Sequence, residues 1–178
     1  MSRKVILTVV ALVLAATLSS IGISCKLSNL AQLVTYTNEA NEFSIDYPQG
    51  WRVEPDLSDP HIRVKICKSL WAQDVGVQVA KHWDEIGGLD SFSQSQIKAA
   101  SNFEDYVPLS TEELTINGIP AIKHIYTGTA SPKSYKFVQI YLVKNEAGWL
   151  LHFFCPEKDF DSHEATFDIM LNSFRLLK

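Results

Sequence analysis

Short segments in which apolar and polar residues alternate follow one another along most of the chain from residue 33 onward. The clearest is FSIDYPQGW at 43–51, where every second residue is apolar until a Pro-Gln-Gly corner leads to a tryptophan. Alternation of this kind is typical of a strand with one buried face. Because proline cannot donate a ladder hydrogen bond and glycine tolerates positive φ, we expect the corner to end this strand and to start a second strand, Arg52–Glu54, antiparallel to it.

Further strands are predicted by the same alternation. The strongest hairpin signal is Asn117-Gly118, because these residue types adopt the two positive-φ positions of a type I′ turn. Two later segments, 135–143 and 149–155, are apolar at most positions, so we expect them to be central strands buried on both faces. A polar loop is expected at 127–134. The other predicted strands are 33–37, 62–67, 75–80, 113–116 and 119–126.

Two helices are predicted from apolar residues spaced three and four apart. The first covers 89–103 with Asp90 or Ser91 as its N-cap, and the second runs toward Phe174 with Asp161 as its N-cap and Glu164 completing a capping box. Strands in meander order with two covering helices predict an α+β fold, a sandwich built on an antiparallel sheet. We expect residues 33–178 to form this single domain.

The N-terminal segment 1–24 has the parts of a secretory signal peptide: a charged start, an apolar run and a region of small residues. Cys25 follows directly, and a small residue before a cysteine at this point resembles the lipobox of bacterial lipoproteins, although Gly22 stands where such boxes usually have leucine. In those proteins the cysteine is acylated and becomes the new N-terminus. We therefore expect a lipidated Cys25, a short tether at 25–32 and a location on the outer face of the cytoplasmic membrane or in the cell envelope.

Two alternatives to lipidation remain open. Residues 5–24 contain about 20 mostly apolar positions, which is enough to cross a bilayer as an uncleaved anchor. Cleavage after a small residue would instead release a secreted protein.

The three cysteines agree with an exported protein. If Cys25 carries lipid, Cys67 and Cys155 remain as an even pair in a compartment where disulfides persist. A Cys67–Cys155 disulfide and two buried free thiols are the alternatives.

The balance of charge argues against a nucleic-acid partner. The formal net charge is -4 over 178 residues, and Arg3 and Lys4 lie in the segment that we expect to be removed. Phosphate binding needs clustered lysine and arginine, which the remaining chain lacks.

The run YTNEANEFSIDYPQGWRVE, with NSFRL far downstream, resembles the PsbP-like family, whose fold is shared with a Ran-binding nuclear import factor. The resemblance implies an α/β/α sandwich around a central antiparallel sheet and a non-enzymatic role. Its best-known members are extrinsic proteins of photosystem II, and many others are bacterial lipoproteins of unknown role. The photosystem role is not carried over to this chain. The residues that carry the likeness are Phe43, Ile45, Tyr47, Pro48, Gly50, Trp51, Ser173 and Phe174.

Histidines are the first candidates for chemistry. His124 and His152 are expected on one face of neighbouring strands, where a carboxylate could complete a zinc site, but no HxH or HExxH spacing supports a metal. Satisfied core or rim histidines are the alternative, and His61, His82 and His163 are expected to be solvated. We predict neither a metal nor a cofactor.

Other candidate groups are paired carboxylates and loop aromatics. The carboxylate pairs Asp84-Glu85, Glu104-Asp105 and Glu112-Glu113 are expected on solvated faces. A glycine-rich phosphate loop and a Gly-x-Ser-x-Gly elbow are both missing from the sequence, so we expect no enzyme. The aromatic residues Trp71, Trp83 and Tyr106 are expected in loops, where they form either a ligand patch or ordinary packing.

Two hypotheses for the function follow. The first is a lipid-tethered binding or assembly module at a membrane complex, with a protein partner that the sequence does not name. The second is an extracytoplasmic protein that binds a small molecule or a metal.

Overall fold

Two antiparallel sheets and two α-helices make up the part of the chain that the computed structural model describes, which is residues 32–55, 58–69, 74–83, 86–130 and 132–177. The predicted signal segment 1–24 and Cys25 lie outside these residues. The larger sheet has seven strands in the order β3 (Arg52–Glu54), β4 (Ile62–Cys67), β5 (Gly76–His82), β9 (Ala147–Pro156), β8 (Lys133–Lys144), β7 (Ile119–Ala130) and β6 (Glu104–Ile116). The smaller sheet has the order β1 (Leu33–Asn38), β2 (Phe43–Pro48) and β10 (Arg175–Leu176).

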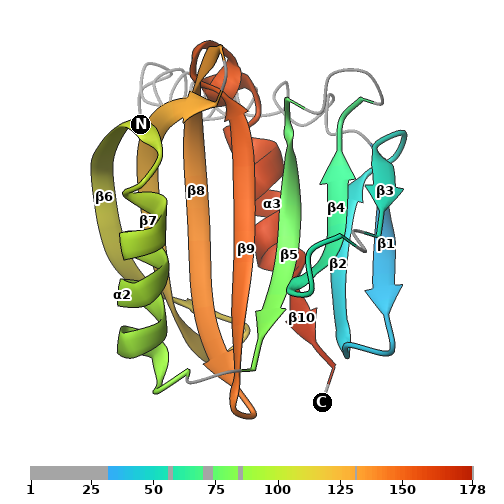
Figure 1. Ribbon diagram of the computed structural model, residues 1–178. Coiled ribbons are helices and arrows are strands. Elements are labelled where there is room, and N and C mark those ends of the chain that lie inside the picture. The colour runs from blue at the N-terminus through green and yellow to red at the C-terminus, as the bar shows by residue number, and fades with distance from the viewer. Residues whose placement is uncertain (1–31, 56–57, 70–73, 84–85, 131, 178) are drawn as a thin grey trace, which may run out of the picture. The chain divides into compact units, whose positions relative to one another are not determined.

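The layers form an α/β/α sandwich, as expected. Helix α2 (Leu89–Ala100) packs on β7 and β8 at one face of the large sheet. Helix α3 (Glu164–Ser173) and the small sheet cover the opposite face, and the 3₁₀ segment η1 (Glu157–Ser162) joins β9 to α3. Figure 1 shows α2 in front of the large sheet and α3 behind it. Strands β8 and β9 are central and are buried on both faces, which confirms the prediction for these two segments.

The Pro-Gln-Gly corner does not join a hairpin, so this prediction was wrong. Strand β2 pairs with β1 and β10 in the small sheet, whereas β3 pairs with β4 in the large sheet. The corner itself forms as expected, with Gly50 at φ 91 and the Trp51 N–H donating to the carbonyl of Pro48. The corner therefore carries the chain from one sheet to the other, and the strand pattern alone could not show which partner each strand would find.

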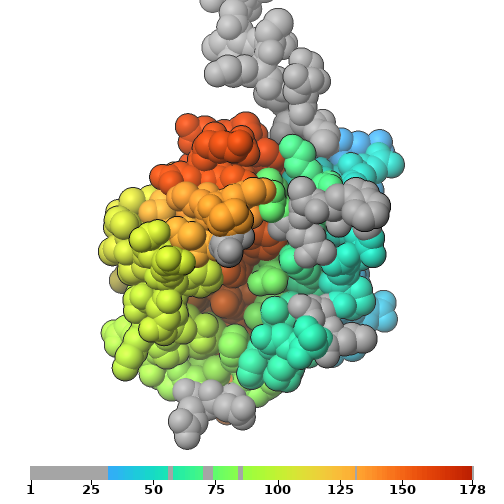
Figure 2. All heavy atoms as spheres, turned by 45° about the horizontal axis from the view of Figure 1, so that its top comes forward, coloured from blue at the N-terminus to red at the C-terminus, as the bar shows by residue number. Residues whose placement is uncertain are grey.

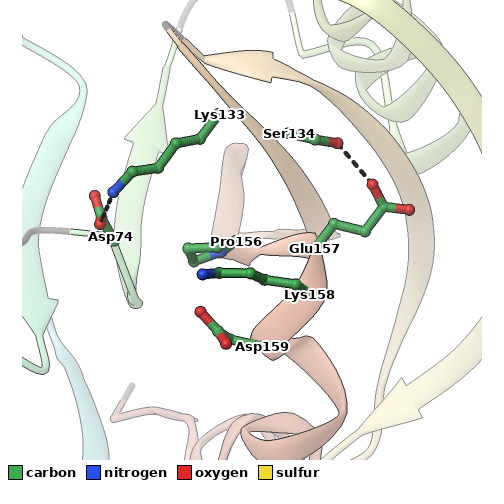
Figure 3. A pocket seen from close by; sticks show the side chains of 7 residues that line it. All are labelled: Asp74, Lys133, Ser134, Pro156, Glu157, Lys158 and Asp159. Carbon is green, nitrogen blue, oxygen red and sulfur yellow. Dashed lines mark hydrogen bonds and ion pairs between the residues drawn. The ribbon is translucent and has the colours of Figure 1, made fainter.

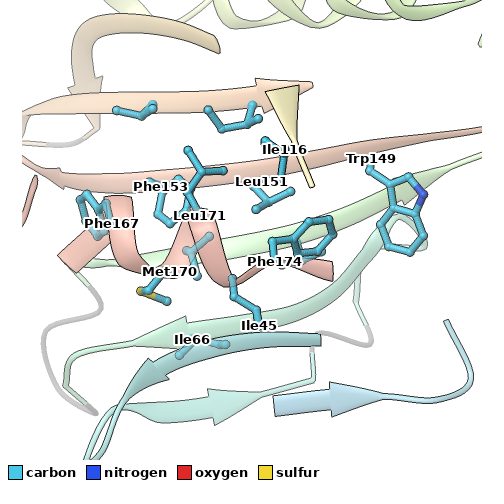
Figure 4. Close-up of a cluster of buried hydrophobic side chains, with 14 of the residues drawn as sticks. Ile45, Ile66, Ile116, Trp149, Leu151, Phe153, Phe167, Met170, Leu171 and Phe174 are labelled. Atoms are coloured by element: carbon cyan, nitrogen blue, oxygen red, sulfur yellow. The ribbon is translucent and has the colours of Figure 1, made fainter. Parts of the chain in front are cut away.

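The main core lies between the large sheet and the layer formed by α3 and the small sheet. Phe43 on β2 is fully buried, and its ring lies 5.6 Å from that of Trp149 and 5.9 Å from that of Phe174. The Asp46 N–H donates to Ser173 Oγ over 2.8 Å, which ties β2 to the end of α3. Figure 4 shows side chains from both sheets and α3 meeting in this core, among them Ile45, Ile66, Ile116, Leu151, Phe153, Phe167, Met170 and Leu171.

Strand β6 is longer than predicted. The residues from Glu104 onward lack the alternation of a half-buried strand, because β6 is an edge strand with both faces largely exposed. Strands β7 and β8 also extend through most of the segment expected as a loop at 127–134. The predicted Asn117-Gly118 turn is present, with positive φ at both residues.

Both predicted helix caps were wrong. Helix α2 follows Gly88 and has no side-chain cap. Helix α3 follows His163, because Asp161 belongs to the preceding 3₁₀ segment. The predicted apolar faces are correct, since Phe92 in α2 and Phe167 in α3 are buried.

Removing the Phe43 ring should destabilise the domain, because its cavity would open where both sheets and α3 meet. We expect Phe43→Ala to lower the free energy of unfolding by about 3–5 kcal/mol. Urea unfolding would measure the change, with Leu109→Ala as the matched control because Leu109 is 52% exposed. A loss of less than about 1 kcal/mol for Phe43→Ala would contradict the shared core.

Candidate functional site

One polar residue from each strand of the large sheet lies in a single register row, which we call the polar row. Strand pairing places Thr111 opposite His124, His124 opposite Gln139, and Gln139 opposite His152. The row continues through Gln78 and Lys65 to Glu54. In order along the row the residues are Thr111, His124, Gln139, His152, Gln78, Lys65 and Glu54.

The polar row crosses the face of the sheet on which α2 packs, and it separates two apolar clusters. One cluster includes Tyr126, Phe137 and Phe154, which are opposite one another in register on β7, β8 and β9. The other includes Tyr141 and Leu150, which are opposite each other in register. They lie two residues along their strands from Gln139 and His152, on the side of the row away from the first cluster. Side chains on one face of a strand repeat every two residues, so the polar row interrupts an otherwise apolar face.

His124 is buried and fully hydrogen-bonded. Its Nε2 lies 2.9 Å from the Tyr106 hydroxyl and its Nδ1 lies 2.8 Å from Thr111 Oγ1. Its side chain is 1% exposed, and burial lowers its pKa. A neutral imidazole has one donor and one acceptor, and two hydroxyl groups can satisfy both. His124 therefore fits the alternative of a satisfied core histidine.

His152 differs from His124 because one of its ring nitrogens lacks a hydrogen-bond partner among the described residues. Its Nε2 is buried, and it has no hydrogen-bond partner among the described residues. The ring lies 5.3 Å from that of Phe137, and burial lowers the pKa of His152 to about 4. The imidazole is therefore neutral at pH 7. An unpartnered buried polar atom costs about 1–3 kcal/mol, so the position is one where a bound molecule could gain a hydrogen bond.

The neighbours of His152 in the row are two carboxamides. Gln139 is 6% exposed, and its Oε1 accepts a hydrogen bond from the Tyr141 hydroxyl. Gln78 is half-buried on the other side. The buried Tyr126 hydroxyl has no partner among the described residues either. This part of the row thus offers both donors and acceptors beside aromatic rings, as sites for uncharged polar ligands do.

Figure 2 shows a hollow on the side of the molecule turned toward the viewer. Yellow-green residues from α2 and its surroundings border one side, and the green strands β4 and β5 border the other. Helix α2 packs on β7 and β8, so the part of the sheet face over β9 and β5 lies beside the helix.

A zinc site at His124 and His152, the alternative that the sequence left open, is not formed by the described residues. His124 and His152 share a sheet face, as expected, but they lie on β7 and β9 with β8 between them. Among the described residues, no three histidine, cysteine or acidic side chains are grouped closely enough to hold a metal ion.

The two cysteines of the domain are free thiols, which contradicts the disulfide alternative. Cys67 packs in the apolar cluster beside α2, whereas Cys155 lies in the core on the opposite face of the sheet. The sheet itself therefore separates the two sulfur atoms. Burial raises the pKa of each thiol to about 11, so both are protonated at neutral pH.

The candidate carboxylates and aromatics are dispersed. Glu112 and Glu113 are exposed on β6, and Glu112 pairs with Lys123 at 3.1 Å. Trp83 is 49% exposed beside the Arg63 guanidinium, 4.7 Å from its ring centre, and is separated from Tyr106 by the strands between β5 and β6. Asp84, Glu85 and Trp71 lie outside the described residues. A ligand patch that joins Trp83 to Tyr106 is therefore not formed.

A polar pocket of about 580 Å³ lies at the end of the large sheet where β8 begins and β9 ends. Figure 3 shows that, among the lining residues, Lys133 pairs with Asp74 and Ser134 donates to Glu157. Hydrogen bonds from Lys133 and Tyr135 lower the pKa of Asp74. The pocket joins residues far apart in the sequence, and no motif could have indicated it.

No protein-family model and no curated protein matches the sequence. Its structure is similar to the solution structure of cyanobacterial PsbP (CyanoP) from Synechocystis sp. PCC 6803, with a TM-score of 0.62 and 16% identity over 88% of this chain and 98% of that chain. It is also similar to LpqN of Mycobacterium tuberculosis, which is described as involved in cell envelope biogenesis, with a TM-score of 0.60 and 11% identity over 85% of this chain and 88% of that one.

A third similar structure is a protein of unknown function from Pseudomonas aeruginosa, described as a putative regulator, with a TM-score of 0.53 and 12% identity over 80% of this chain and 96% of that one. At these identities the likeness concerns the fold alone. The fold is PsbP-like, as the resemblance in the sequence implied. Among the described residues, no helix combines the length and the apolar character needed to span a membrane.

The two histidines of the polar row should respond differently to removal of their nitrogens. His124→Phe leaves the hydroxyls of Tyr106 and Thr111 without their partner, so we expect a loss of about 1–3 kcal/mol in the free energy of unfolding. His152→Phe removes an unpartnered atom, so we expect the free energy of unfolding to stay within about 0.5 kcal/mol or to rise. Urea unfolding at pH 7 would measure both.

The pH dependence of the free energy of unfolding gives a second test of His152. The pKa of His152 falls from 6.5 to about 4 on folding, so its contribution to stability is present above pH 6.5 and is lost as the pH falls toward 4. The wild type should lose more stability over this range than His152→Phe. Equal losses in the two histidine variants at pH 7 would show that His152 Nε2 has a partner.

Proposed function

We propose that the protein is an exported, lipid-anchored PsbP-like protein that acts without catalysis as a binding or assembly module at a membrane complex. The observation that carries the proposal is the position of Cys25, which follows a segment with the parts of a signal peptide and stands eight residues before Leu33. Strand β1 begins at Leu33. Eight residues span at most about 29 Å, so acyl chains on Cys25 would hold the domain close to the bilayer.

The state of the candidate nucleophiles supports a role without catalysis. Cys67 and Cys155 are buried, and their raised pKa leaves little thiolate at neutral pH. The His124 nitrogens are occupied by two hydroxyl groups. The similar structure of LpqN, described as involved in cell envelope biogenesis, supports a place in the envelope.

A second candidate function is the binding of a small, uncharged polar molecule outside the cytoplasm. The observation that favours it is the unpartnered Nε2 of His152 between Gln78 and Gln139. Binding there would supply the missing hydrogen bond.

The anchor can be tested by intact mass and by detergent phase separation. We expect the mature protein to begin at Cys25 with added acyl chains and to enter the detergent phase. Cys25→Ala removes the acylated sulfur, so the variant should lack the acyl mass. Cys67→Ala is the matched control, because its sulfur is buried in the domain, and it should retain the acyl mass.

Two results would contradict the lipid anchor. An unacylated wild-type protein in the aqueous phase would mean that the protein is secreted. A wild-type mass that still includes residues 1–24 without acyl chains would mean that the segment is an uncleaved anchor.

A further inference from the structure

We propose that the outer edge of β6 binds an extended, basic segment of a partner protein, which adds to the large sheet as an eighth strand. This inference rests on the proposed function as a binding module. Within the part of the chain that the structure describes, strand β6 pairs only with β7 and forms one edge of the sheet, on the left in Figure 1. The opposite edge strand, β3, has 3 residues, whereas β6 has 13.

Side chains on both faces of β6 are exposed to solvent. Every residue from Val107 to Glu113 is exposed, and Val107 and Leu109 are 51% and 52% exposed although both are apolar. Edge strands present unpaired backbone N–H and C=O groups, which are a template for another strand. Partner proteins that add a strand gain affinity from these groups and specificity from the side chains beside them.

The second half of β6 is the part that can accept a regular strand. The register with β7 shifts between Glu104 and Val107 and again between Pro108 and Ser110, so the first half is irregular, and Pro108 has no N–H. From Ser110 to Ile116 the register with β7 is continuous. Seven regular residues match the usual length of a strand.

The charge of this edge specifies the chemistry of the partner. Strand β6 contains Glu104, Asp105, Glu112 and Glu113 and no lysine or arginine. Two more carboxylates, those of Glu164 and Asp168, line the groove between β7 and α3. Lys123 lines the same groove and pairs with Glu112. A partner strand with lysine or arginine at alternate positions would complement this surface.

A second copy of this chain fits the edge poorly. An antiparallel pair of β6 strands centred on the regular segment 110–116 would place Glu113 opposite its own symmetry mate. Like charges directly opposite one another destabilise a strand pair. The charge therefore favours a basic partner over self-association.

The proposal can be tested with a synthetic peptide, acetyl-KTKVKTKVK-amide, and hydrogen–deuterium exchange of the full chain in detergent. We expect the peptide to slow exchange at 110–116 and to leave exchange in β1 unchanged. A matched peptide with N-methyl groups at alternate residues keeps the charge but cannot donate the ladder hydrogen bonds, so it should lose this protection.

Protein variants test the contribution of charge. We expect the double variant Glu112→Gln/Glu113→Gln to weaken peptide binding by about twofold, because the two carboxylates lie on opposite faces of β6 and only one of them shares a face with the lysines of the peptide. The control Glu39→Gln/Glu146→Gln removes two exposed carboxylates outside β6 and should bind as the wild type does.

Three results would overturn the proposal. Equal binding of the N-methylated peptide would mean charge attraction without strand addition, and the lack of any protection at 110–116 would mean that the edge does not accept a strand. Protection that appears without peptide and rises with protein concentration would mean that a second copy occupies the edge. None of these results depends on whether Cys25 is acylated. A negative result for strand addition is therefore distinct from a negative result for the lipid anchor.

Discussion

The burial of β8 and β9 on both faces is the constraint on which the rest of the structure depends. Strand β9 sends Leu151 and Phe153 to one side of the sheet and Leu150 and Phe154 to the other, and all four side chains are buried. Two apolar faces require a covering layer on each side. The order of elements supplies both layers, with α2 on one face and α3 with the small sheet on the other. The α/β/α sandwich follows from this requirement.

The two faces of the large sheet differ in how they are filled. The face against α3 and the small sheet forms a continuous apolar core. The face against α2 is divided by the polar row into two separate clusters. A buried polar row costs stability unless its members are paired, and His152 is not paired within the described residues. The first face therefore holds the larger apolar core, and the second holds polar atoms that lack a partner among the described residues.

Local sequence patterns predicted the turns and strands whose structure depends mainly on their own residues. The positive φ values of Asn117 and Gly118 follow from their residue types, and the double-sided apolar pattern of 149–155 follows from its central position. Pairing between distant strands could not be predicted in the same way. The FSIDYP strand joins the small sheet and the strand after its corner joins the large one, because the identity of a strand's partner depends on residues far away in the sequence. The polar row was missed for the same reason, since it exists only in the register of seven strands. The part of edge strand β6 before Glu113 was missed because an exposed strand needs no apolar alternation.

The small sheet and α3 share one cooperative core with the large sheet. Native-state hydrogen exchange of the backbone amides tests it most directly, because it measures the free energy of opening for each element. If the core is shared, the slowest amides of β2, α3 and β9 exchange with the same free energy, equal to that of global unfolding. Exchange of β2 and α3 at a clearly lower free energy than β9 would show that this layer opens independently, and it would contradict a single shared core.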